Sequence, residues 1–156
     1  MKRRMAMVAA ATTAAMALTG CATGQSEGTH PNEQMVREGY AAFNNRDMET
    51  VLALFADGIT FIVPGRSLQA GTFRGKGEVQ RYFSLVGRHT AGTHSLDIQD
   101  VVANDRRVVV LVRGLGTHED KVFDQLLVHS WKVRDGKFTE LHLVPTDQYA
   151  FDEFWS

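Results

Sequence analysis

The side chain with the greatest chemical potential in this sequence is the imidazole of His129, two residues before Trp131. It lies in an apolar run with strand-favouring residues, 123–133, and Asp135-Gly136 separates this run from a second one. Two such runs around an Asp-Gly turn predict a β-hairpin. Because strand side chains alternate between faces, His129 shares its face with Leu127 and Trp131. An imidazole on an apolar face is a candidate general base.

Asp147 is the carboxylate that could orient this imidazole. A period of two from Leu143 places Asp147 on the same strand face as Leu143, although Pro145 can interrupt the register. A His129–Asp147 pair would be a general base with its orienting group. The alternative is a hydrogen-bonded core histidine, with Asp147 capping the segment 148–154. We favour this alternative because a perturbed polar group indicates function only statistically.

Length and composition predict one globular domain with no nucleic-acid partner. The chain has 156 residues, of which 44% are hydrophobic, which is enough for a single core. The formal net charge is −1, and no basic stripe marks a surface for nucleic acid. The single cysteine excludes an intrachain disulfide.

Residues 1–20 predict a secretory signal peptide, with Lys2-Arg3-Arg4 before an alanine-rich apolar stretch. The stretch ends in Leu18-Thr19-Gly20-Cys21, which resembles the lipobox of bacterial lipoproteins. That resemblance implies cleavage before Cys21 and a diacylglyceryl anchor on its thiol, which is sufficient for stable membrane attachment. The alternative is an ordinary signal peptide with a leftover cysteine. We expect a bacterial cell-envelope protein, lipid-anchored to a membrane and facing outside the cytoplasm.

A small, polar, glycine-containing segment, residues 21–31, predicts a flexible tether before a domain over residues 32–156. Hydrophobic spacing and punctuating residues predict the elements of that domain. In chain order these are helices 33–44 and 48–55, a strand 59–63, a loop 65–73, a helix 75–86, and four strands that begin near residues 93, 107, 123 and 138. Helices grouped before a strand meander predict the α+β class.

Four motifs resemble the SnoaL-like branch of the NTF2-like superfamily. They are Tyr40-Ala41-Ala42-Phe43-Asn44-Asn45-Arg46-Asp47, Phe73-Arg74-Gly75-Lys76-Gly77-Glu78-Val79, His129-Ser130-Trp131, and Asp147-Gln148-Tyr149-Ala150-Phe151-Asp152. The resemblance implies a cone-shaped fold in which three N-terminal helices pack on a curved antiparallel sheet and enclose a pocket. It also implies possible homodimers through the outer sheet face. Isomerases, cyclases, dehydratases and binding modules all use this fold, so it does not define one function.

Ketosteroid isomerisation, the best-understood chemistry on this fold, needs an aspartate base and two acidic donors at the carbonyl oxygen. Aligned through the flanking motifs, the donor tyrosine falls on Gly39, one step from Tyr40, and the base falls on Val63. The third position falls on Val128 or His129. Two of the three groups are absent at their positions, so we do not expect ketosteroid isomerase activity.

The apolar residues on the predicted inner faces, together with His129, are the expected pocket. They are Tyr40, Phe61, Val63, Phe83, Leu127, His129, Trp131 and Leu143. The remaining histidines have no spacing that indicates a metal site. We therefore expect neither a metal nor a cofactor.

These features lead to one preferred function and two alternatives. The preferred function is a membrane-tethered domain that binds a small apolar or amphipathic ligand in its cavity. The first alternative is an enzyme of the cyclase, isomerase or dehydratase type that uses His129 with Asp147. The second is a structural partner of another envelope protein.

Overall fold

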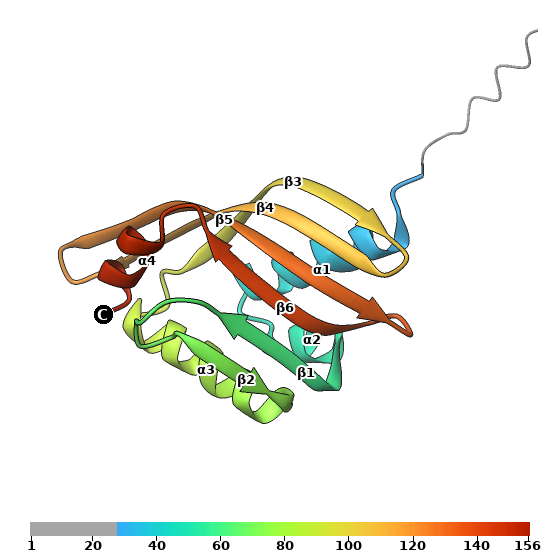
Figure 1. Ribbon diagram of the computed structural model, residues 1–156, viewed down its shortest axis with the longest axis horizontal. Coiled ribbons are helices and arrows are strands. Elements are labelled where there is room, and N and C mark those ends of the chain that lie inside the picture. Colours follow the sequence, from blue (N-terminus) through green and yellow to red (C-terminus); the bar gives the residue numbers. More distant parts are fainter. Residues whose placement is uncertain (1–27) are drawn as a thin grey trace, which may run out of the picture.

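The computed structural model describes residues 28–156 (Figure 1). The predicted signal peptide, the lipidation residue Cys21 and most of the predicted tether lie outside the described residues. No helix within 28–156 is long and apolar enough to cross a membrane.

Six strands form one curved sheet with the order β2-β1-β6-β5-β4-β3. Their bounds are β1 Phe55–Val63, β2 Gly71–Arg74, β3 Ser95–Asn104, β4 Arg107–His118, β5 Lys121–Arg134 and β6 Lys137–Pro145. The sequence had suggested a wholly antiparallel sheet. The sheet is instead mixed, because β1 pairs with β6 in parallel. The expected loop 65–73 is shorter than predicted. Its last residues, from Gly71, belong to β2, because residues 71–74 pair with the end of β1.

Within residues 28–156, four helices accompany the sheet, whereas the sequence predicted three. They are α1 Pro31–Asn44, α2 Met48–Ala53, α3 Gly75–His89 and α4 Gln148–Phe154. The N-terminal three cover the concave face of the sheet, and α4 lies at one end, beside β5 and β6 (Figure 1). α2 ends at Ala53 and not at the predicted Phe55, because Phe55 already belongs to β1 and pairs with Phe138 of β6.

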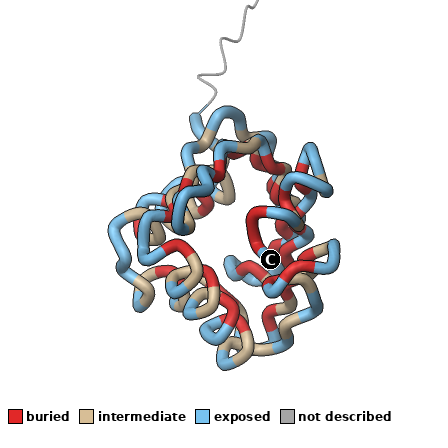
Figure 2. The backbone as a smooth tube through the Cα atoms, turned by 90° about the vertical axis from the view of Figure 1, so that its left-hand side faces the viewer, coloured by how far each residue is buried: buried red, intermediate tan, exposed pale blue. Residues whose placement is uncertain are grey.

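The core lies between the helices and the concave face. Strand alternation is clear in β4 and β5, where Val108, Val110 and Val112 point inward along with Leu127 and Trp131. Figure 2 shows buried residues on the inward-facing sides of the elements and exposed residues at the turns and rims. The interior is rich in aromatic rings, which pack edge-to-face around Phe61.

The C-terminal helix closes one end of the domain and fastens the loop between β1 and β2. Asp152 Oδ1 accepts hydrogen bonds from the backbone nitrogens of Arg66 and Ser67, at 3.0 and 3.3 Å. The backbone nitrogen of Leu68 donates to the carbonyl oxygen of Trp155, at 3.1 Å. Trp155 itself is only 1% exposed. The apolar end of the chain therefore contributes to the core.

Candidate functional site

A cavity of about 70 Å³ lies between the helices and the concave face of the sheet. Seven of the eight residues predicted to form a pocket line it, namely Tyr40, Phe61, Phe83, Leu127, His129, Trp131 and Leu143. Val63 is buried but is not part of the lining. It is the last residue of β1, one strand period beyond Phe61.

Three of the buried side chains that line this cavity are joined by hydrogen bonds. Trp131 Nε1 donates a hydrogen bond to the hydroxyl oxygen of Tyr40, at 3.2 Å. The same hydroxyl lies 2.5 Å from Nδ1 of His129. α1 supplies Tyr40, and neighbouring inward positions of β5 supply the other two residues. We call this arrangement the Trp131–Tyr40–His129 relay.

The relay defines where the protons lie. An indole nitrogen is only a donor, so the Tyr40 oxygen accepts from Trp131. The Tyr40 proton is then free to point at His129 Nδ1, which accepts it as the unprotonated nitrogen of a neutral imidazole. The opposite tautomer would leave the buried Tyr40 hydroxyl proton without this acceptor. The single proton of His129 therefore resides on Nε2.

Burial keeps the relay neutral. Desolvation, together with the nearby His94, lowers the pKa of His129 to about 3. Desolvation also raises the pKa of Tyr40 far above its ordinary value, although the hydrogen bond from Trp131 opposes this shift. At neutral pH, His129 thus presents an Nε2–H donor, and a general base at this atom would need the other tautomer.

Comparison with known proteins places this site in a family. The model of the SnoaL-like domain matches residues 36–141, which is most of the chain. An uncharacterised protein of Mycobacterium tuberculosis is 30% identical over 123 residues, covering 78% of this chain and 94% of that protein. The chain belongs to the SnoaL-like family.

Solved structures agree with this assignment. Bal32a, from a soil-derived mobile gene cassette, has a TM-score of 0.78 and 32% identity, over 81% of this chain and 97% of its own. TerC, crystallised with polyporic acid, has a TM-score of 0.71 and 26% identity, over 80% of this chain and 98% of its own. The fold is the NTF2-like fold that the sequence motifs implied.

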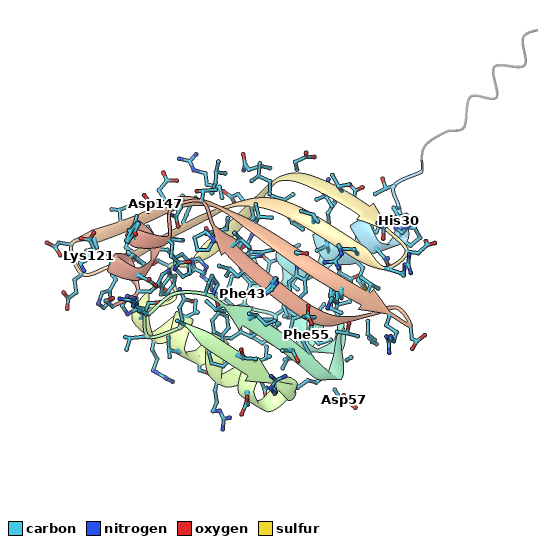
Figure 3. All side chains as sticks on the ribbon, in the orientation of Figure 1. His30, Phe43, Phe55, Asp57, Lys121 and Asp147 are labelled. Carbon is cyan, nitrogen blue, oxygen red and sulfur yellow. The ribbon has the colours of Figure 1, made fainter. Side chains whose placement is uncertain are left out.

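In this SnoaL-like domain, Asp147 does not meet His129. Asp147 is exposed, and its carboxylate caps α4 by accepting from the backbone nitrogens of Tyr149 and Ala150, each at 3.0 Å. Figure 3 shows Asp147 beside α4, away from the interior where Phe43 and Phe55 lie. The register fails beyond Pro145 because the strand ends there. The structure therefore agrees with the favoured interpretation, in which Asp147 caps the segment 148–154 and His129 is a hydrogen-bonded core histidine whose partner is Tyr40.

A surface groove of about 270 Å³ adjoins the cavity between α3 and the end of α1. Four side chains line both spaces, Phe43, Phe83, Val86 and His94. His94 is 8% exposed, and desolvation lowers its pKa to about 4. These shared side chains form the partition between the groove and the interior.

Several lining residues escaped sequence reasoning, notably Gln69, His94 and Trp155. Gln69 lies in the loop fastened by α4, where no hydrophobic period exists to indicate burial. The apolar character of the C-terminal segment was the available signal for Trp155. Among residues 28–156, no group of three His, Cys, Asp or Glu side chains is placed to hold a metal ion.

Proposed function

We propose that this SnoaL-like domain binds a small, largely apolar or amphipathic molecule in its cavity. The main support is the lining, in which aromatic and aliphatic side chains surround a few polar atoms, the arrangement typical of ligand pockets. TerC, a structural relative, was crystallised with polyporic acid, and this supports a small organic molecule as the ligand of the fold.

The cavity must enlarge to receive such a ligand. Its volume of about 70 Å³ is well below the roughly 300 Å³ at which ligand pockets begin. The adjoining groove adds about 270 Å³ across the partition of Phe43, Phe83, Val86 and His94. Because Phe83 is only partly buried, rotation of its side chain with that of Phe43 would join the two spaces. The ligand then enters between α1 and α3.

The test of ligand binding is native mass spectrometry of the protein purified from its own host, followed by organic extraction. We expect a stoichiometric apolar compound. Protein that carries nothing would contradict a tight carrier, and co-purification with another envelope protein would favour the structural alternative. The same spectrum reports the subunit number. A homodimer would fit the exposed apolar residues on the outer sheet face, among them Val102, Val122 and Val144.

Catalysis of the cyclase or isomerase type is the second candidate, and the relay is the observation that favours it. A neutral Nε2–H in apolar surroundings can stabilise negative charge that develops on a substrate carbonyl oxygen. His129 would then act as a hydrogen-bond donor supported by Tyr40, and the earlier role for Asp147 is not needed. Turnover of a carbonyl substrate that is lost in His129→Ala, with ligand affinity retained, would establish this activity.

We also propose that a lipid on Cys21 holds the domain at a membrane of the bacterial cell envelope. Its support is the lipobox-like sequence that ends at the single cysteine. Replacing Cys21 by serine removes the thiol that carries the lipid, so we expect the protein to stop incorporating labelled fatty acid. Thr23→Ser is the control and should keep the label. Fatty-acid incorporation that survives Cys21→Ser would contradict the anchor.

A further inference from the structure

We infer that the ligand of this cavity is a neutral molecule whose apolar body carries hydrogen-bond acceptor oxygens, recognised by the N–H groups of Gln69, His129 and Trp155. The inference rests on the proposed function, because it specifies the chemistry of a ligand in the same cavity. It assigns a recognition role to two residues, Gln69 and Trp155, that the relay does not contain.

The first observation is where the unpaired polar atoms lie. Five buried side-chain atoms of the described residues have no hydrogen-bond partner in the protein. Three of the five belong to residues that line the cavity: Gln69 Nε2, His129 Nε2 and Trp155 Nε1. Each of these residues is at most 4% exposed. A buried polar group without a partner costs roughly 1–3 kcal/mol, so three such groups on residues that line one cavity indicate a partner that enters it.

The second observation is that two of these groups lie on segments fastened together. Gln69 follows Leu68, whose backbone nitrogen donates to the carbonyl oxygen of Trp155. Asp152 holds the same loop through the backbone nitrogens of Arg66 and Ser67. Gln69 and Trp155 therefore lie on adjoining segments at the end of the domain closed by α4. His129 lies deeper, on β5, where the relay fixes its ring.

The third observation is the chemical character of the three atoms. Trp155 Nε1 can only donate, and the Gln69 amide nitrogen donates through either of its two hydrogens. His129 donates through Nε2, because Nδ1 accepts from Tyr40. The site thus offers three donors, and their complement is a carbonyl, ether or hydroxyl oxygen.

The apolar lining of the cavity also restricts the charge that the ligand can carry. The lining consists of aliphatic and aromatic residues together with Gln69 and two histidines, and burial lowers the pKa of both histidines below neutrality. Bringing an ionised group into such surroundings carries a large desolvation penalty. A neutral ketone or ether avoids that penalty and still satisfies the donors.

A matched pair of probes tests this inference, 1-tetralone and tetralin, which share a bicyclic skeleton and differ in one carbonyl oxygen. We expect the protein to bind 1-tetralone at least tenfold more tightly in calorimetric titration. Trp155→Phe and Gln69→Leu each remove donors and keep an apolar side chain. At least one of them should reduce the preference about tenfold without weakening tetralin binding. Leu127→Met, which removes no donor, should retain the preference.

Indole resonances give a second measurement that does not depend on a variant folding. The chain has two tryptophans, and Trp131 already donates to Tyr40. In ¹⁵N-labelled protein, we expect 1-tetralone to move the Nε1–H signal of Trp155 downfield, or to protect the His129 Nε2–H, and to move Trp131 little.

The outcomes separate this inference from the proposed function. If both probes bind with equal affinity, or if the ketone preference survives both variants with no change at Trp155 or His129, the donors do not select the ligand and the inference is overturned. In that case the cavity still binds apolar molecules. If neither probe binds, ligand binding in the cavity and the inference fail together.

Discussion

Replacing Tyr40 by phenylalanine is expected to lower the free energy of unfolding by about 2–4 kcal/mol, although it removes a single oxygen atom. That oxygen contacts Nδ1 of His129 and the indole N–H of Trp131, so the substitution leaves two buried polar groups without partners. Each unpaired group costs roughly 1–3 kcal/mol. Urea unfolding at pH 7, with the slope of the transition checked for constancy, measures the change.

Tyr82→Phe is the matched control. Tyr82 is also buried, lines the same cavity and has a pKa raised by desolvation, but it lies outside the relay. We expect its replacement to change the free energy of unfolding by less than about 1 kcal/mol. Equal destabilisation by the two substitutions would show that the relay contributes no more to the free energy of unfolding than any buried hydroxyl of this cavity. It would also remove the basis for assigning the His129 proton to Nε2.

Local patterns predicted much of this fold. The turn at Asp135-Gly136 has positive φ at both residues, 52° and 67°, which is the conformation that an Asp-Gly pair favours. Asp47 caps α2 by accepting from the backbone nitrogen of Thr50, as its side chain predicts. In each case the residues that determine the conformation are neighbours in the chain, so a short window contains the necessary information.

Pairings between distant segments were less predictable. β1 lies beside β6 in parallel although about eighty residues separate them, and no turn residue encodes that register. The sequence left two interpretations of Asp147 open: a strand face shared with Leu143 past Pro145, and a cap for the segment 148–154, which we favoured. The chain leaves the sheet after Pro145, and the Asp147 side chain satisfies the backbone nitrogens at the start of α4. A strand pattern and a cap signal competed at one residue, and the cap prevailed.

In the candidate site, too, the features set by neighbouring residues were predictable and the contact between distant segments was not. Alternation along β5 correctly placed His129 and Trp131 on one inner face. The contact that gives His129 its chemistry comes from Tyr40, 89 residues earlier. Sequence alignment had set Tyr40 one helical step from the position of a donor tyrosine, yet both Gly39 and Tyr40 line the cavity. A Cβ at Gly39 would lie 3.1 Å from Cδ1 of Leu54, so this position is closely packed against Leu54 and cannot hold a tyrosine without displacing it.

Acid is expected to destabilise this domain between pH 6.5 and about 4, through His129 and His94. Desolvation lowers their pKa values in the folded protein to about 3 and about 4, whereas histidines in the unfolded chain titrate near 6.5. The unfolded chain therefore binds more protons in this range. Their contribution to stability is fully present above pH 6.5 and is lost as the pH falls toward the folded values. Each histidine adds a slope of up to about 1.4 kcal/mol per pH unit, so both remove about 2–4 kcal/mol by pH 5.

Chemical unfolding measured at intervals from pH 7.5 to 4.5 tests this expectation. His94→Gln should reduce the slope by about half, because glutamine does not titrate but can still donate to the carbonyl oxygen of Leu115, as His94 Nδ1 does at 2.9 Å. A flat profile in the wild-type protein would mean that water or a proton reaches both imidazoles easily. Such access would require an interior open to solvent, and neither the neutral relay nor the donor-lined cavity would then hold.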